Sequence, residues 1–191
     1  MLYKTIISVD DLKNNLNKDD FIIFDSRCDI KDSGYGIDSY TEGHIPNSIF
    51  VDVDTDLASE KRPGTGRHPL PDPNTFSEKL SHWGMSNNKQ VVVYDDAGGA
   101  FAGRLWWMLK WLGHEAVAVL DGGLNSWVKG GNKLVTTPTV FEKAHFEPRI
   151  QENMIATVED VEEAQFKMNT ILLDARSKER YQGINDPVDP I

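Results

Sequence analysis

One segment of the sequence has the residue types and order of a loop that could hold a reacting group. The apolar residues 91–94 lead into a loop of acidic and small residues, and a stretch of helical character follows. A strand, a tight loop and a helix N-terminus aim several backbone N–H groups at one point, which suits an anion or an ionised nucleophile. The loop residues are Asp95, Asp96, Ala97, Gly98, Gly99 and Ala100.

The residue in the nucleophile position of this loop is Asp95. A carboxylate is a poor nucleophile for most group transfers, and it repels anionic substrates. The loop is not a nucleotide-binding P-loop either, because no Gly-Lys-Ser/Thr follows it. The sequence therefore predicts the geometry of an active-site loop without the group that would react.

The single cysteine, Cys28, is a poor substitute for that group. It follows Arg27 and has acidic neighbours, which raise a thiol pKa and disfavour the reactive thiolate. A Cys-x5-Arg phosphatase signature is absent, because position 34 is Gly34. One cysteine also excludes an internal disulfide framework and a cysteine-rich metal centre. It suits a reducing compartment, so we expect a cytoplasmic protein.

The sequence indicates neither a metal nor a cofactor. No two histidines stand at the i, i+4 spacing that places two imidazoles on one face of a helix. The pair of glycines at Gly34 and Gly36 is too short to match a dinucleotide-binding fingerprint. The histidines are His44, His68, His82, His114 and His145.

Length and charge exclude other classes of function. The 191 residues are enough for one ordinary domain of about 100–200 residues plus a remainder. The net charge of −10 argues against a nucleic acid or an anionic membrane as partner. No stretch approaches the roughly 20 apolar residues of a membrane span. Residues 61–68 form a basic, Pro- and Gly-rich loop, which is either an anion-attracting rim or an ordinary solvated loop.

The elements around the candidate loop indicate an α/β domain over residues 1–132. Continuous apolar runs at residues 21–24, 49–51, 91–94 and 117–120 are typical of strands buried on both faces of a parallel sheet. Helical patterns alternate with them: one after the N-cap Ser8, one at residues 75–83 and one at residues 100–112. This alternation favours a central parallel sheet flanked by helices.

An internal repeat indicates what the C-terminal part of the chain is. Shifted by 149 residues, residues 8–12 align with 157–161 and residues 22–27 with 171–176. Both copies have an N-cap, an acidic first helical turn, an apolar strand pattern and an Asp-x-Arg ending. We therefore expect a linker at residues 133–153 and the start of a second copy at residues 154–191. The apolar residues 171–173 of that copy would be an unpaired strand, which is an association hazard.

The order of several motifs resembles the N-terminal domain of tandem rhodanese-type sulfurtransferases, a family that includes thiosulfate and 3-mercaptopyruvate sulfurtransferases. The resemblance covers essentially the whole chain and is specific because of the order of the motifs. The motifs are Asp25-Ser26-Arg27, Tyr40-Thr41-Glu42-Gly43-His44-Ile45-Pro46-Asn47-Ser48, Val92-Val93-Tyr94-Asp95, Arg104-Leu105-Trp106-Trp107, Gly113-His114 and Leu120-Asp121-Gly122-Gly123-Leu124-Asn125-Ser126-Trp127.

This resemblance implies two rhodanese domains, of which only the second carries the catalytic cysteine. The first keeps an acidic residue at the equivalent point, so residues 95–100 would be a vestigial active-site loop with Asp95 as that acid. In the family, the thiolate takes the sulfane sulfur of a small anionic donor, and the resulting persulfide passes it to a thiol or cyanide. With the 149-residue interval, the cysteine is expected near position 244, beyond Ile191.

The resemblance also implies a role for Arg180. Residues 174–181 match the Asp-x-Arg-x-x-x-Arg-Tyr/Phe segment of the family, whose last arginine binds the anionic substrate. Arg180 is therefore the expected substrate-binding residue, and its guanidinium suits a sulfonate or carboxylate. Arg176 and Arg27 are expected to support the loops. The alternative function is a non-catalytic rhodanese-like binding or regulatory module.

Overall fold

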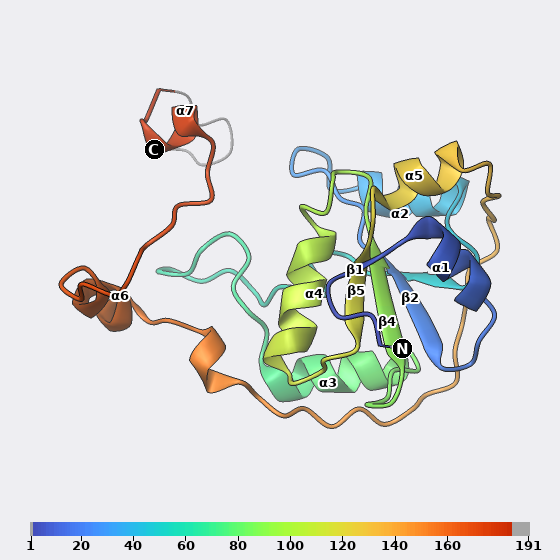
Figure 1. Ribbon diagram of the computed structural model, residues 1–191, viewed down its shortest axis with the longest axis horizontal. Coiled ribbons are helices and arrows are strands. Elements are labelled where there is room, and N and C mark those ends of the chain that lie inside the picture. Colours follow the sequence, from blue (N-terminus) through green and yellow to red (C-terminus); the bar gives the residue numbers. More distant parts are fainter. Residues whose placement is uncertain (1, 185–191) are drawn as a thin grey trace. The chain divides into compact units, whose positions relative to one another are not determined.

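The computed structural model describes residues 2–184, which fall into two compact units, Met1–Gln151 and Glu152–Ile191 (Figure 1). The expected start of a second copy at residues 154–191 therefore lies within the second unit, and its residues 185–191 lie outside the described part of the chain.

The first unit is built on a parallel sheet. Four strands lie where the apolar runs predict them, and their parallel pairing is confirmed. The fifth strand, β1, has only two residues and leaves no recognisable pattern in the sequence. The spatial order is β1-β5-β4-β2-β3. The strands are β1 (Ile6–Ile7), β2 (Phe21–Asp25), β3 (Ser48–Phe50), β4 (Gln90–Tyr94) and β5 (Val117–Leu120).

Helices cover both faces of this sheet, with α3 and α4 on one side and α1 and α5 on the other (Figure 1). α2 packs beside β3, where Tyr40 contacts the Phe50 ring. The Ser8 side chain caps α1 as the sequence predicts, whereas α2 and α5 have no side-chain cap and were not predicted. The helices are α1 (Val9–Asn15), α2 (Tyr35–Glu42), α3 (Pro73–His82), α4 (Ala102–Trp111) and α5 (Gly123–Lys129).

The register of the sheet positions the candidate loop. Asp25 pairs with Tyr94 at the carboxyl ends of the central strands β2 and β4. Every residue of these two strands is buried, as expected for continuous apolar runs between two helical layers. The residues that follow the two strands therefore emerge next to each other at one edge of the sheet.

The segment that the sequence assigns to a linker is packed on the first unit. Residues 133–151 contain no helix, but Val135 exchanges two backbone hydrogen bonds with His44, and the Phe146 side chain is only 2% exposed. Most of this segment is thus part of the first unit by packing.

The second unit contains a short 3-10 helix, η1 (Glu152–Met154), and two helices, α6 (Val158–Ala164) and α7 (Lys178–Tyr181). α6 has the length and the cap position that the repeat predicts from α1. Residues 171–173, expected as an unpaired strand, have no ladder partner within the described chain and remain exposed. No helix in residues 2–184 is long and apolar enough to cross a membrane.

Candidate functional site

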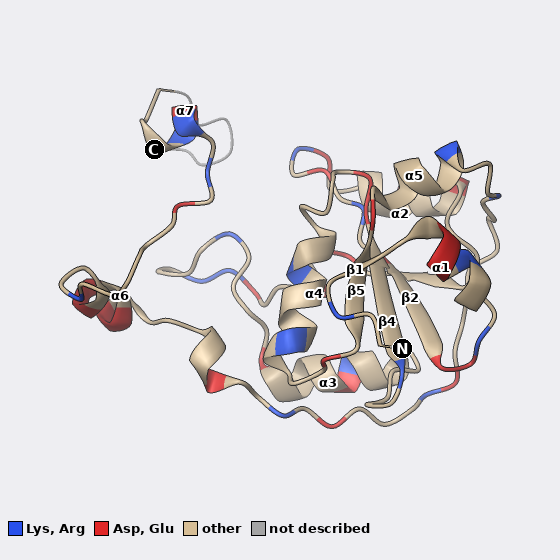
Figure 2. Cartoon of the chain, viewed as in Figure 1, with Lys and Arg blue, Asp and Glu red and all other residues tan. Residues whose placement is uncertain are grey.

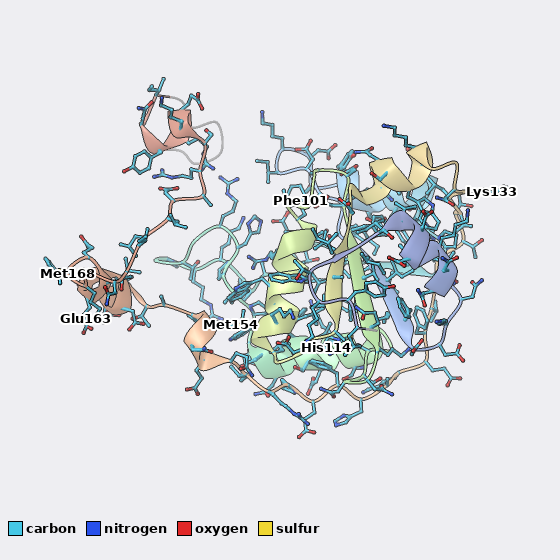
Figure 3. The ribbon with its side chains drawn as sticks, viewed as in Figure 1. Phe101, His114, Lys133, Met154, Glu163 and Met168 are labelled. Carbon is cyan, nitrogen blue, oxygen red and sulfur yellow. The ribbon has the colours of Figure 1, made fainter. Side chains whose placement is uncertain are left out.

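The loop after β4 encloses the carboxylate of Asp95. One oxygen accepts hydrogen bonds from the amides of Ala97 (3.0 Å) and Gly99 (2.8 Å), and the other from Phe101 (2.9 Å) and Ala102 (2.9 Å). Asp95 is fully buried. Phe101 lies at the start of α4 in Figure 3, so the last two amides belong to the N-terminus of that helix. These four amides, which could otherwise stabilise an external anion, are therefore satisfied by the chain itself.

A second acidic residue lies at the outer side of this loop. Asp96 is half-buried and accepts a hydrogen bond from the Tyr35 hydroxyl of α2. This hydrogen bond is the main cause of the raised pKa of Tyr35. Asn125 of α5 donates to the Asp96 carbonyl oxygen at 3.1 Å. The loop is thus tied to helices on both sides, and two neighbouring acids make it unfavourable for an anionic substrate.

A buried ion pair supports the loop from the adjacent strand. The Arg27 guanidinium donates to both oxygens of Asp25 (2.7–3.1 Å) and to the Gly43 carbonyl oxygen at 2.8 Å. The Tyr94 hydroxyl donates to Asp25 at 2.6 Å and accepts from the Ile45 amide at 3.1 Å. The Asp-x-Arg motif is therefore structural in the first unit, as expected for Arg27.

Burial taken alone has opposite effects on the pKa values of Tyr94 and Arg27, but both pKa values end up raised. Burial and then the charge of Asp25 raise the pKa of Tyr94 well above its ordinary value, so the hydroxyl keeps its proton and donates it. Burial by itself lowers the pKa of Arg27, but hydrogen bonding to Asp25 and the Asp25 charge outweigh it and raise the pKa. Arg27 therefore keeps its charge, and Tyr94 stays neutral as a hydrogen-bond donor. The role of Tyr94 in it is not visible in the sequence, because it depends on strand register.

Cys28 follows this network but is not activated by it. Burial and then the charges of Asp54, Asp52 and Asp29 raise the pKa of its thiol to about 11. The sequence shows only the nearest of these acids, because Asp52 and Asp54 come from the segment after β3. A thiol with this pKa is protonated at neutral pH and is a weak nucleophile.

The basic loop before α3 is anchored at its base and exposed at its tip. Arg104 of α4 donates to the carbonyl oxygens of Leu57 (2.7 Å) and His68 (3.0 Å), and burial lowers its pKa. His68 also contacts Asp54 at 2.7 Å. Lys61 and Arg62 are exposed on the loop, where Figure 2 shows a run of basic residues. The two interpretations of this loop, an anion-attracting rim and a solvated loop, both remain compatible with the exposure.

Arg180, the predicted substrate-binding residue, lies in the second unit. It is half-buried in α7, and its amide contacts the Ser177 hydroxyl at 3.4 Å. Upstream, Arg176 forms a two-pronged pair with Asp174 at 2.6–3.0 Å. This pair is the main reason that the pKa of Asp174 falls to about 2. The predicted site residues are therefore divided between the units, with the six loop residues in the first and Arg180 in the second.

Known proteins share this sequence and fold. The rhodanese-like domain family matches residues 8–130. A Pseudomonas aeruginosa protein named "Probable 3-mercaptopyruvate sulfurtransferase" is 37% identical over 188 residues, which are 97% of this chain and 66% of that protein. Thiosulfate sulfurtransferase of Rattus norvegicus is 33% identical over 156 residues, which are 80% of this chain and 51% of that protein.

The fold of a solved relative agrees with these matches. The crystal structure of a 3-mercaptopyruvate sulfotransferase from Escherichia coli aligns with a TM-score of 0.82 and 27% identity, covering 98% of this chain and 71% of that one. The chain spans about half to two thirds of the length of the two curated relatives described above. The parallel five-stranded sheet and the family match agree, and the chain therefore belongs to the rhodanese-like domain family, whose matching curated relatives are sulfurtransferases.

Proposed function

We propose that this chain provides the first, non-catalytic domain of a tandem sulfurtransferase, followed by the start of a catalytic second domain. In the proposed reaction, a cysteine thiolate attacks the outer sulfur of thiosulfate or the sulfur of 3-mercaptopyruvate. The bond between that sulfur and the rest of the donor breaks, and sulfite or pyruvate leaves. The resulting persulfide then transfers its outer sulfur to a thiol or cyanide and regenerates the thiolate.

The filled loop of the first unit carries this proposal. Four amides already bind the Asp95 carboxylate, which therefore occupies the position that a reactive thiolate would need. Cys28, with its pKa of about 11, is no alternative nucleophile. A reactive cysteine must then come from another loop of the same kind. The repeat interval places the counterpart of Asp95 near position 244, in a second domain that would continue beyond Ile191.

Arg180 is the proposed binding residue for the donor. Its guanidinium offers the planar set of N–H groups that suits a sulfonate or carboxylate. It follows the Asp174–Arg176 pair, which repeats the local contacts of Asp25 and Arg27. By this correspondence, Arg176 supports the chain, and Arg180 is the proposed contact to the donor in the complete second domain. The proposed location is the cytoplasm, since one cysteine suits a reducing compartment.

The test is to express the whole reading frame and assay sulfur transfer from thiosulfate to cyanide and from 3-mercaptopyruvate to a thiol. Replacing the cysteine expected near position 244 with Ser should abolish both activities, whereas the matched Cys28→Ser variant should keep them. Arg180→Gln should raise the KM for the donor. Residues 1–191 alone should show no turnover and no added sulfur on Cys28 by intact mass. Persulfide on Cys28 of this chain would contradict the proposal.

The second candidate function is a non-catalytic binding or regulatory module. The same loop favours it, because the Asp95 carboxylate takes the position of a reactive group and accepts the amide hydrogen bonds there. A reading frame with no cysteine loop near position 244 would select this function over the first.

A further inference from the structure

The segment 133–151, here called the strap, lies outside the matched rhodanese-like domain but is bound to the first unit along its length. In Figure 1 it follows α5 and runs along the outside of the first unit to the end of α4. Lys133, labelled in Figure 3, accepts a hydrogen bond from the Trp127 indole at its carbonyl oxygen (3.0 Å). Further along, the backbone of Glu147 exchanges two hydrogen bonds of 2.8 and 2.9 Å with the Asn87 side chain amide.

The end of α3 holds the middle of the strap. The Ser81 carbonyl oxygen accepts from the Ala144 amide at 2.9 Å, and the Ser81 hydroxyl accepts from the Phe146 amide at 3.0 Å. The Phe146 side chain is only 2% exposed and meets the His114 ring edge-on. Most other strap side chains face solvent, so the strap is held mainly by its backbone, and its sequence has the polar composition of a linker.

The last part of the strap supplies hydrogen-bond donors that the end of α4 lacks. A helix leaves its last carbonyl oxygens without partners inside the helix. The Leu112 carbonyl oxygen accepts from the Arg149 amide at 2.8 Å. The Trp111 carbonyl oxygen accepts from the Gln151 amide at 2.8 Å. The strap therefore caps α4 from outside, and its bonds to the last turn of α3 do the same for that helix.

Two glycines allow this close approach. A Cβ on Gly84, just after α3, would lie 2.5 Å from the Phe141 Cβ. A Cβ on Gly113, just after α4, would lie 2.5 Å from the Arg149 carbonyl oxygen. Both distances are far below van der Waals contact, so the strap comes closer to the helix ends than any larger residue permits.

The chain has a different character after Gln151. Glu152–Met154 form the single turn η1, and residues 155–156 have no regular structure. These residues are mostly exposed. The next fixed point is Thr157, whose side chain caps α6. The chain between the last strap anchor and this cap is therefore only residues 152–156.

We propose that the strap is a built-in cap of α3 and α4 that confines the flexible joint between the two domains to residues 152–156, instead of residues 133–156. The effective concentration of a tethered domain falls with roughly the −3/2 power of tether length, so a tether about one fifth as long raises it about tenfold. This consequence rests on the proposed second domain, whereas the capping and the position of the joint do not.

The test is hydrogen exchange of backbone amides in the 191-residue chain, followed by NMR. The amides of Arg149 and Gln151 should be protected, and residues 153–156 should exchange at nearly the rate of an unstructured chain. A Glu-specific protease should cut after Glu152 before it cuts after Glu147. The proposal is overturned if the Arg149 and Gln151 amides exchange at the unstructured rate, or if the two cuts occur equally fast.

Gly113→Ala is the diagnostic variant, because its Cβ would displace Arg149 from the end of α4. Protection of the Arg149 amide should fall about fivefold or more, as expected for loss of one hydrogen bond, while the Ala144 amide keeps its protection.

Gly131→Ala is the matched control. Gly131 has a similar left-handed φ, 72° against 78° at Gly113, but its Cβ would meet nothing within 4 Å. It should leave the Arg149 amide unchanged. Equal losses in the two variants would show that backbone strain and not the strap contact is responsible, and would overturn the capping role. The wild-type measurements decide the position of the joint even if Gly113→Ala does not fold.

Discussion

The first copy of the repeat (residues 8–27) and the second (residues 157–176) have the same local contacts. α1 and α6 both have seven residues and begin 149 residues apart. The Ser8 hydroxyl accepts from the amide three residues on at 3.1 Å, and the Thr157 hydroxyl does the same at 3.2 Å. These caps depend on residues within one helical turn, so both copies form them without help from the rest of the fold.

The Asp-x-Arg endings also match in detail. Arg27 holds Asp25 through two guanidinium nitrogens and its own amide, and Arg176 holds Asp174 in the same way. The shortest contacts are 2.7 Å in the first copy and 2.6 Å in the second. A pair two positions apart in the chain closes locally, whatever surrounds it.

The two copies differ in everything that needs a distant partner. Ile23 is 1% exposed within β2, while its counterpart Leu172 is 52% exposed and belongs to no strand. Met168, labelled in Figure 3, is fully exposed. β2 pairs with both β3 and β4, which come from later in the chain. The comparison teaches that the helix cap and the ion pair are local properties, whereas the strand exists only where neighbouring strands supply its hydrogen bonds.

The largest expected difference between the copies concerns the two arginines. Arg27→Met leaves the buried Asp25 carboxylate without its partner and should destabilise the first unit by about 3–5 kcal/mol. Arg176→Met removes the same contact at an exposed position and should leave that stability unchanged. Urea unfolding followed by tryptophan fluorescence measures both. Equal losses of stability in the two variants would contradict the view that burial makes the Asp25–Arg27 pair the more important one.

The next difference concerns the apolar residues at the centre of each strand pattern. Ile23→Ala should cost about 2–5 kcal/mol, because it removes a fully buried side chain and leaves a cavity. Leu172→Ala is the matched change and should shift the unfolding midpoint negligibly, since Leu172 is half-exposed. A large effect of Leu172→Ala would show that the second copy packs in solution against a partner not seen here.

A third test compares two positions for a thiol. Asp95→Cys in a Cys28→Ser background places a cysteine where four amides and the start of α4 stabilise negative charge, so its pKa should fall below the ordinary 8.5. Cys28 in the wild type has a pKa of about 11. The pH profiles of iodoacetamide alkylation should therefore differ by at least about two units. Coincident profiles would show that the loop does not favour an anion.

The smallest expected effect concerns the caps, where the copies should agree. Ser8→Ala removes the acceptor for the third amide of α1 and should destabilise the first unit by about 1 kcal/mol. Thr157→Ala makes the same change in α6 and should lower its helicity, measured by hydrogen exchange of its amides. An effect in only one of the two helices would contradict the view that both caps act locally and alike.

Much of the first unit was predictable from residue type and spacing. Continuous apolar runs located β2, β3, β4 and β5, and side-chain capping located the start of α1. β1 was missed because two residues carry no periodicity, and α2 because Gly34 and Gly36 suggest a turn instead of a helix. Residues 171–173 were expected as an unpaired strand, and they form no ladder within the described residues, because an apolar run pairs only where a neighbouring strand is present.

The sequence by itself determined the order of the elements, the repeat interval and the acid in place of a nucleophile at Asp95, because these depend on residue type and spacing. Only the tertiary structure decided that four amides converge on Asp95, that Tyr94 completes the Asp25–Arg27 network and that Thr137 lies against the His44 ring. Each of these contacts joins segments whose approach is set by sheet register and helix packing. Residue type and spacing are properties of the local sequence, whereas these contacts depend on segments that are distant in the chain.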